Sequence, residues 1–293
     1  SPFMNTPLRR PVRASNFELL RLLAMLLVLI LHANYLTFRF PAFEALHDQP
    51  LGSLGRIWSE SLAIVGVNVF VLISGYFGIR LRIKGMVSLL FQAAFYSIGI
   101  YLALVALDRE PFQTTAFLRT FFPLDRSKEW FLPTYLSLMI LSPLLNALVQ
   151  KQTEQGLRHY LIFFYVLSTL FGFLSDQLDV QYGYSIFSFC GIYLLGRYFH
   201  LYPEGVERCK TSMLIAIYLG VSLVQSLAFF AYGYTSGQSI VANALTGTFL
   251  SYASPMNILT AVALFLAFSR LKLQSRAINW IASSTFAVYL IHC

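Results

Sequence analysis

Long apolar runs separated by short polar connectors form the pattern of this chain. Nine runs are long enough to cross about 30 Å of hydrocarbon as a helix, at residues 17–36, 57–78, 86–107, 130–149, 159–175, 184–200, 212–231, 250–269 and 278–293. No internal repeat, low-complexity tract or soluble segment interrupts them. The pattern predicts an all-α polytopic membrane bundle, forming one integral membrane domain over residues 1–293.

The composition supports this prediction, with 57% hydrophobic and only 12% charged residues. A soluble globule of 293 residues needs more polar side chains to cover its surface. The three cysteines match no disulfide framework, and the five histidines are scattered without ligand spacing. We therefore expect no metal site.

Both ends of the chain carry signals about the length of the natural protein. The last run stops at Ile291-His292-Cys293 without a polar flank, which predicts a tenth span in the full-length protein. Ser1-Pro2-Phe3 precedes Met4 and reads as a cloning scar. The first apolar run is too long for a signal peptide and lacks a small-residue cleavage site.

The distribution of Lys and Arg predicts the orientation, because cytoplasmic loops hold the excess. One set of alternate loops holds 14 of the 21 basic residues and the other set holds 6, with Arg21 inside a span. The N-terminus is therefore expected in the cytoplasm and the protein in the cytoplasmic (inner) membrane. This bias explains most of the net charge of +8 without a nucleic-acid partner.

Arg21 and His32 lie inside the first apolar run, where an ionisable residue is expensive unless it has a function. Eleven helical positions rotate by about 1100°, so the two side chains are about 20° apart in azimuth and about 16 Å apart along the axis. The two side chains are therefore expected on the same face of the helix, at different depths in the membrane. The His32 imidazole can remove a proton from an alcohol near neutral pH. A structural histidine bonded to a neighbouring helix is the alternative.

Arg21 keeps its charge, so it must reach the interface, pair or bind an anion. Glu18, three residues earlier, can pair with it. Alternatively, Arg21 meets a phosphate or amide of an anionic cytoplasmic donor whose reactive end reaches His32. Their separation is comparable to an extended pantetheine arm, which a coenzyme A thioester carries.

Four segments of the chain carry a family resemblance. They are Asn16-Phe-Glu-Leu-Leu-Arg-Leu-Leu-Ala-Met with His32 beyond it, Asn68-Val-Phe-Val-Leu-Ile-Ser-Gly-Tyr-Phe77, Trp130-Phe-Leu-Pro-Thr-Tyr135 continuing to Leu141-Ser-Pro-Leu-Leu-Asn146, and Ser284-Thr-Phe-Ala-Val-Tyr-Leu-Ile-His292. In this order they resemble the acyltransferase 3 family of integral membrane acyltransferases. In detail the chain is most similar to the branch that O-acylates bacterial surface polysaccharides.

The resemblance implies ten spans and an enzyme, an O-acyltransferase. Its acyl donor is usually cytoplasmic acetyl-CoA, and its acceptor is a sugar hydroxyl on a lipid-linked or cell-surface glycan. Carried over by motif, His32 is the catalytic histidine and Arg21 its partner. His32 then acts either as a general base or as an acetyl-carrying nucleophile. The departure from the family is the final span, which the chain lacks.

Residues of the second motif are candidates for donor binding. Tyr76 offers a hydroxyl and Gly75 permits close backbone approach, although small-residue helix packing explains the glycine equally well. Basic residues follow and are candidates for the phosphates of coenzyme A, with a generic cytoplasmic anchor as the alternative; they are Arg80, Arg82 and Lys84.

Other candidates stand toward the outer side. Trp130, with Tyr135, is predicted to bind the acceptor sugar or shape an acyl tunnel, and an interfacial belt tryptophan is the alternative. Glu129 and Glu60 compete to assist His32, and the sequence does not choose between them. The mixed-charge outer connectors at residues 37–54 and 108–129 suit a polar acceptor such as a sugar.

Three further interpretations concern His292 and the functions other than acyl transfer. His292 is read as a structural histidine in an apolar helix. A transporter or flippase could use Arg21 and His32 as a substrate or proton relay, although the chain shows no inverted halves. A non-catalytic subunit of a glycan export complex is the third functional hypothesis.

Overall fold

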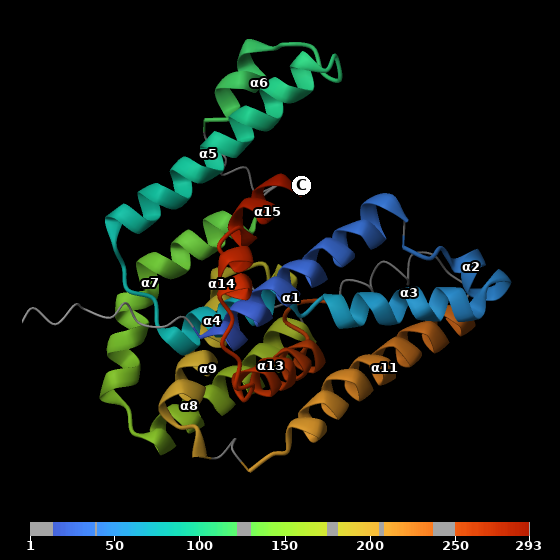
Figure 1. Cartoon of the computed structure of the whole chain (residues 1–293). Coiled ribbons are helices and arrows are strands. Elements are labelled where there is room, and N and C mark those ends of the chain that lie inside the picture. The colour runs from blue at the N-terminus through green and yellow to red at the C-terminus, as the bar shows by residue number, and fades with distance from the viewer. Residues whose placement is uncertain are drawn as a thin grey trace, which may run out of the picture.

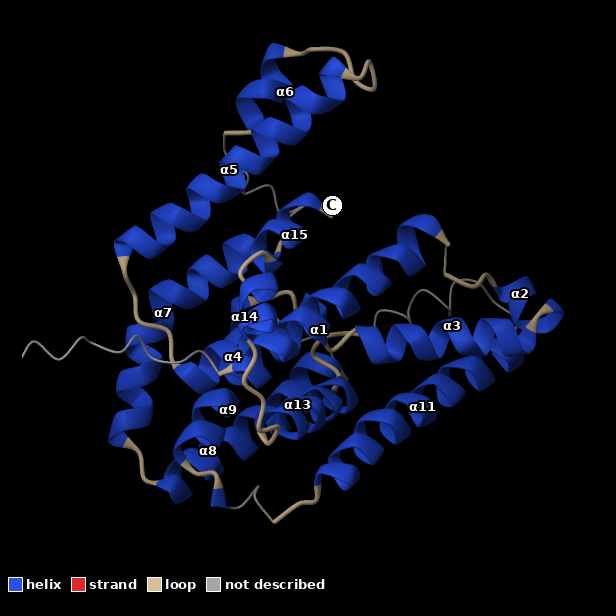
Figure 2. Cartoon of the chain, viewed as in Figure 1, coloured by secondary structure: helices blue, strands red, loops and turns tan. Residues whose placement is uncertain are grey.

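The computed structural model describes residues 14–38, 40–121, 130–174, 181–204, 208–236 and 250–292. These ranges contain helices and no strand, which confirms the all-α prediction (Figures 1 and 2). The helical elements are α1 (Ser15–His32), the π-helix η1 (Ala33–Thr37), α2 (Phe43–Asp48), α3 (Pro50–Ala63), α4 (Gly66–Phe77), α5 (Ile83–Ala106), α6 (Thr114–Arg119), α7 (Phe131–Lys151), α8 (Glu154–Leu167), the π-helix η2 (Ser168–Phe173), the 3₁₀ turn η3 (Gln181–Gly183), α9 (Ile186–Leu201), α11 (Thr211–Ser236), α13 (Pro255–Ser269), α14 (Arg276–Ala282) and α15 (Thr285–Ile291).

In the described ranges, five helical stretches are long and apolar enough to cross a bilayer, so the chain is an integral membrane protein. They are Ser15–Thr37, Pro50–Phe77, Ile83–Ala106, Phe131–Lys151 and Thr211–Thr235. Two of the other predicted spans are the shorter apolar helices α9 and α13. The predicted span at 159–175 is α8 continued by η2, and the one at 278–293 is divided into α14 and α15 by a turn at residues 283–284.

Helix α1 lies at the centre of the bundle and packs against α3, α4, α13, α14 and α15 (Figure 1). Its first turn is fixed by polar contacts. Asn16 Nδ2 donates to the carbonyl oxygens of Phe268 and Ser269 at 3.1 and 3.2 Å, which satisfies acceptors at the end of α13. The Ser275 amide donates to Ser15 Oγ at 2.9 Å. These contacts set the position of the helix that carries Arg21 and His32.

Helices α4 and α9 approach closely through two glycines. A Cβ atom on Gly75 would collide with the carbonyl oxygen of Tyr193, and one on Gly196 would collide with that of Leu72. Small residues permit this backbone contact between membrane helices. The structure therefore uses Gly75 for helix packing.

The chain leaves α4 through Gly78, whose φ of +74° favours glycine. The Ile79 amide donates to Tyr193 Oη at 3.0 Å, and Tyr193 Oη donates to Asn146 Oδ1 at 2.8 Å. Asn146 Nδ2 in turn donates to the Ile79 carbonyl at 3.0 Å. Both backbone groups of Ile79 are thus held just before the basic segment at residues 80–84.

Candidate active site

A cavity of about 320 Å³ lies beside α1 and collects side chains from α4, α5, α7, α14 and α15. Several residues named by the sequence analysis line it together: Arg21, His32, Ser74, Trp130, Tyr135 and His292. A second, apolar groove of about 610 Å³ lies between α8 and α9 and contains none of these side chains. The first cavity is therefore the candidate active site.

His32 ends α1 and its ring borders the cavity. Its Nδ1 lies 2.9 Å from the carbonyl oxygen of Val28, one turn earlier. Because a carbonyl only accepts, Nδ1 carries the proton in this hydrogen bond and Nε2 is the basic nitrogen. The π-helix η1 begins at the next residue, and such irregular turns are frequent at functional sites. His32 is therefore held by its own helix with its basic nitrogen at Nε2.

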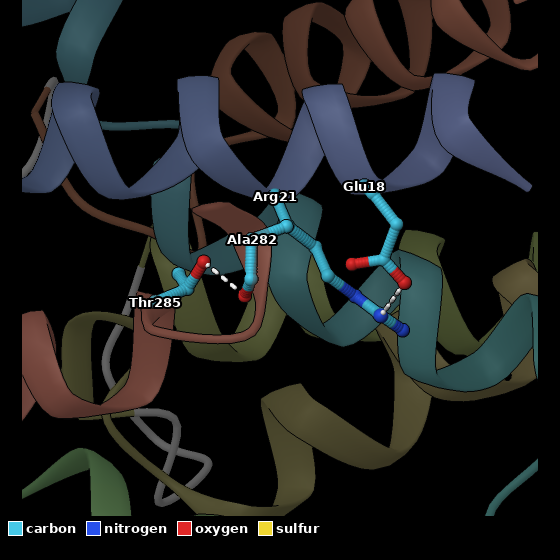
Figure 3. A network of polar contacts seen from close by, with 4 residues as sticks. All are labelled: Glu18, Arg21, Ala282 and Thr285. Atoms are coloured by element: carbon cyan, nitrogen blue, oxygen red, sulfur yellow. Dashed lines mark hydrogen bonds and ion pairs between the residues drawn. The ribbon is translucent and has the colours of Figure 1, made fainter. Parts of the chain in front are cut away.

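Arg21 pairs with Glu18 and also borders the cavity. Its Nη1 lies 2.8 Å from Glu18 Oε1, and both side chains stand on the same side of α1 (Figure 3). Arg21 also lines the cavity, as does Thr285, the first residue of α15. The Glu18 carboxylate orients the guanidinium without removing it from the cavity wall.

Glu60 lies away from this lining. It is 1% exposed on α3, and Asn34 Nδ2 donates to its Oε2 at 2.9 Å. Its polar partner is thus Asn34 of η1, not His32. Glu129, the competing carboxylate, falls outside the described residues.

An aromatic wall closes the cavity on the side of α7. The Trp130 ring lies 4.4 Å from that of Tyr184 and 5.4 Å from that of Tyr252, measured between centroids. Tyr135 stacks on Phe131 at 5.6 Å, and its hydroxyl is 3.1 Å from Ser74 Oγ. Trp130 is therefore part of an interior cluster and also borders the cavity.

The comparison with known protein families decides the identity of the chain. The model of an acyltransferase domain, that of the acyltransferase 3 family, matches residues 15–293. The chain belongs to the acyltransferase 3 family. No curated protein and no solved structure matches it significantly.

Four of the donor-binding candidates of this acyltransferase lie outside the cavity lining, whereas Arg21 borders it. The Tyr76 ring packs against those of Phe17 at 5.0 Å and His200 at 4.8 Å, and its carbonyl accepts from Arg197 Nη1 at 3.3 Å. Exposed basic side chains follow: Arg80 and Arg82 lie on the segment that joins α4 to α5, and Lys84 lies in the first turn of α5. The structure does not bring these four residues to His32.

The sequence did not indicate that His292 lies beside His32 in the cavity of this acyltransferase. The His292 ring meets that of His32 at 4.6 Å between centroids, with an interplanar angle of 89°. The only sequence signal was its position in the last motif, because its neighbours are apolar and His32 lies near the other end of the chain.

Within the described part of the chain, no three His, Cys, Asp or Glu side chains gather as a metal site.

Proposed function

We propose that this acyltransferase moves an acetyl group from cytoplasmic acetyl-CoA to a sugar hydroxyl of a cell-surface or lipid-linked glycan. The observation that carries the proposal is one cavity, inside a membrane bundle of this family, lined by both Arg21 and His32. A base and a cation on one wall match the needs of acyl transfer from an anionic thioester.

His32 is the proposed catalytic group. Its Nε2 takes the proton of the acceptor hydroxyl, the hydroxyl oxygen attacks the thioester carbonyl carbon, and the carbon–sulfur bond breaks. The Nδ1 contact with Val28 keeps the ring oriented and stabilises the positive charge that the ring gains. Attack by Nε2 itself, with an acetyl-histidine intermediate, uses the same nitrogen and is the second version of the mechanism.

Arg21 is proposed to hold the donor deeper in the cavity. Its helical spacing from His32 places the two about 16 Å apart along α1, which suits a pantetheine arm lying along the helix. The exposed basic residues at the end of α4 then meet the nucleotide phosphates on the cytoplasmic side. They are Arg80, Arg82 and Lys84, and Tyr76, near the end of α4, is a further donor-binding candidate.

Trp130 and Tyr135 are proposed to bind the acceptor. Sugar rings present apolar faces that pack on aromatic side chains, and the Tyr135 hydroxyl supplies a polar contact. Their place on the cavity wall supports this role. A cytoplasmic N-terminus, with the protein in the cytoplasmic membrane, would direct this side outward.

The test compares wild type with His32→Ala, using radiolabelled acetyl-CoA and a membrane glycolipid extract as acceptor. Label in glycan and free thiol are measured together. We expect the variant to lose at least about 100-fold in rate, the usual minimum for removing a general base. His159→Ala is the matched control, since His159 is exposed on α8. Its rate should equal that of wild type.

Two results would contradict the proposal. Full transfer by a folded His32→Ala protein would exclude both versions of the mechanism. Intact thioester with all proteins, accompanied by movement of substrate across proteoliposomes, would support the transporter hypothesis instead.

A further inference from the structure

Two imidazole rings from opposite ends of the chain meet in the cavity. His32 ends α1 and His292 follows α15. Their rings touch edge to face, with centroids 4.6 Å apart, and both border the same space of about 320 Å³. A substrate that reaches one imidazole therefore also lies near the other.

Each ring is oriented by a carbonyl of its own helix. His32 Nδ1 lies 2.9 Å from the oxygen of Val28, and His292 Nδ1 lies 2.5 Å from the oxygen of Tyr289. A carbonyl oxygen accepts only, so Nδ1 bears the proton in both rings and Nε2 is the nitrogen that gains or loses a proton. Both rings are therefore held through Nδ1.

The lining of the cavity offers no carboxylate among its described residues. Its other charged or titratable members are Arg21 and three tyrosines, Tyr135, Tyr252 and Tyr289. Arginine keeps its proton and tyrosine holds its own up to about pH 10. Among the described lining residues, the two histidines are the side chains of the type that most often serves as both proton donor and proton acceptor in catalysis.

We propose that His292 is a second catalytic imidazole, which gives its proton to the departing thiolate while His32 takes the proton of the acceptor hydroxyl. The inference rests on the proposed function in its general-base version. In one turnover the oxygen–carbon bond forms and the carbon–sulfur bond breaks. His32 ends protonated and His292 neutral, and a proton passing from His32 to His292 across their contact restores the starting state.

The test separates proton donation from packing by changing the leaving group. His292→Gln and His32→Gln are assayed with acetyl-CoA and with S-(4-nitrophenyl) thioacetate, whose acidic thiol leaves without a proton. The membrane glycolipid extract is the acceptor. We expect His292→Gln to lose at least about 100-fold in kcat with acetyl-CoA but less than about threefold with the activated thioester. His32→Gln should lose activity with both donors.

The pH profile gives a second readout. With acetyl-CoA, wild type needs a neutral His32 and a protonated His292, so kcat/KM should rise and then fall as the pH increases. The falling limb should disappear in His292→Gln, because no acid remains to lose its proton. His159→Gln should keep the profile of wild type. The thermal unfolding of each variant in detergent is measured beside its activity, and His292→Asn is a second variant should His292→Gln not fold.

Three results would overturn the inference. Equal losses with both donors would show that His292 only supports the packing of His32. Unchanged kcat and an unchanged pH profile in His292→Gln would show that it takes no part. A wild-type protein that transfers no acetyl group from either donor would overturn the proposed function, and this inference with it.

Discussion

The bundle buries polar side chains in two regions that differ in what those side chains face. Between α3 and α11 lies a polar seam, in which hydrogen bonds join Trp58 to Ser222 at 3.3 Å, Tyr218 to the Leu62 carbonyl at 2.8 Å, and Ser61 to Ser226 at 2.9 Å. In the cavity beside α1, polar side chains instead border an enclosed space, as Arg21 and His32 do.

Comparing the two regions separates structural from functional polar residues within apolar helices. In the seam, each of these hydrogen bonds joins two helices and leaves its groups occupied, which is a structural use of polarity. In the cavity, the polar atoms face room for a substrate, which is the arrangement expected of a functional site. Glu60 meets this criterion at one oxygen only: Asn34 donates to its Oε2, whereas its Oε1 is buried without a hydrogen-bond partner among the described residues.

The largest effect that tests this contrast is expected on the cavity side, at Arg21. Arg21→Gln should lower kcat/KM for acetyl-CoA by about 100-fold, equivalent to about 2.7 kcal/mol, because it removes the cation proposed to hold the donor. The apparent melting temperature should fall moderately, because the variant leaves the Glu18 side chain, which is 10% exposed, without its partner guanidinium, and an unpaired buried polar group costs about 1–3 kcal/mol. Kinetics and thermal unfolding in detergent measure both quantities.

Glu18→Gln is the matched control for this prediction. It removes the same 2.8 Å ion pair but keeps the guanidinium on the cavity wall. We expect it to retain at least about a third of wild-type kcat/KM. Equal losses in the two variants would mean that the ion pair itself matters, and that Arg21 acts as a structural residue like those of the seam.

Local geometry made part of the site predictable. The helical repeat put Arg21 and His32 on one face, and the motif beginning at Trp130 supplied a wall of the cavity. The contacts of His292 with His32 and of Asn34 with Glu60 depend on how remote helices pack, and no local pattern encodes them. The sequence pattern likewise does not show that α8 continues as a π-helix or that α14 and α15 are separate helices.

Variants at Glu60 are expected to have an effect of intermediate size. They test directly whether the polar seam and the cavity differ in function. Glu60→Ala removes the acceptor of the Asn34 amide, and leaving that donor unpaired should cost about 1–3 kcal/mol of stability. Glu60→Gln keeps an oxygen for Asn34 and should cost less than about 1 kcal/mol, with acetyl transfer within about threefold of wild type. The melting temperatures of both variants and the transfer rate of Glu60→Gln check this prediction.

An inactive but folded Glu60→Gln protein would give the opposite answer. It would show that the carboxylate, rather than a hydrogen-bond acceptor at that position, is required for turnover. Glu60 would then join His32 in the chemistry, and the boundary drawn between the seam and the cavity would be wrong.

The smallest effect is expected deep in the seam, at Ser226. Ser226→Ala removes one hydroxyl of the pair with Ser61 and should lower stability by about 0.6 kcal/mol, the average for a hydrogen bond between membrane helices. The double variant Ser61→Ala with Ser226→Ala should be no less stable than the single one, since neither position keeps an unpaired hydroxyl. Transfer rates should match wild type in both. A tenfold loss of transfer at unchanged melting temperature would show that the seam controls the cavity, because only an effect on the active site reduces turnover without reducing stability.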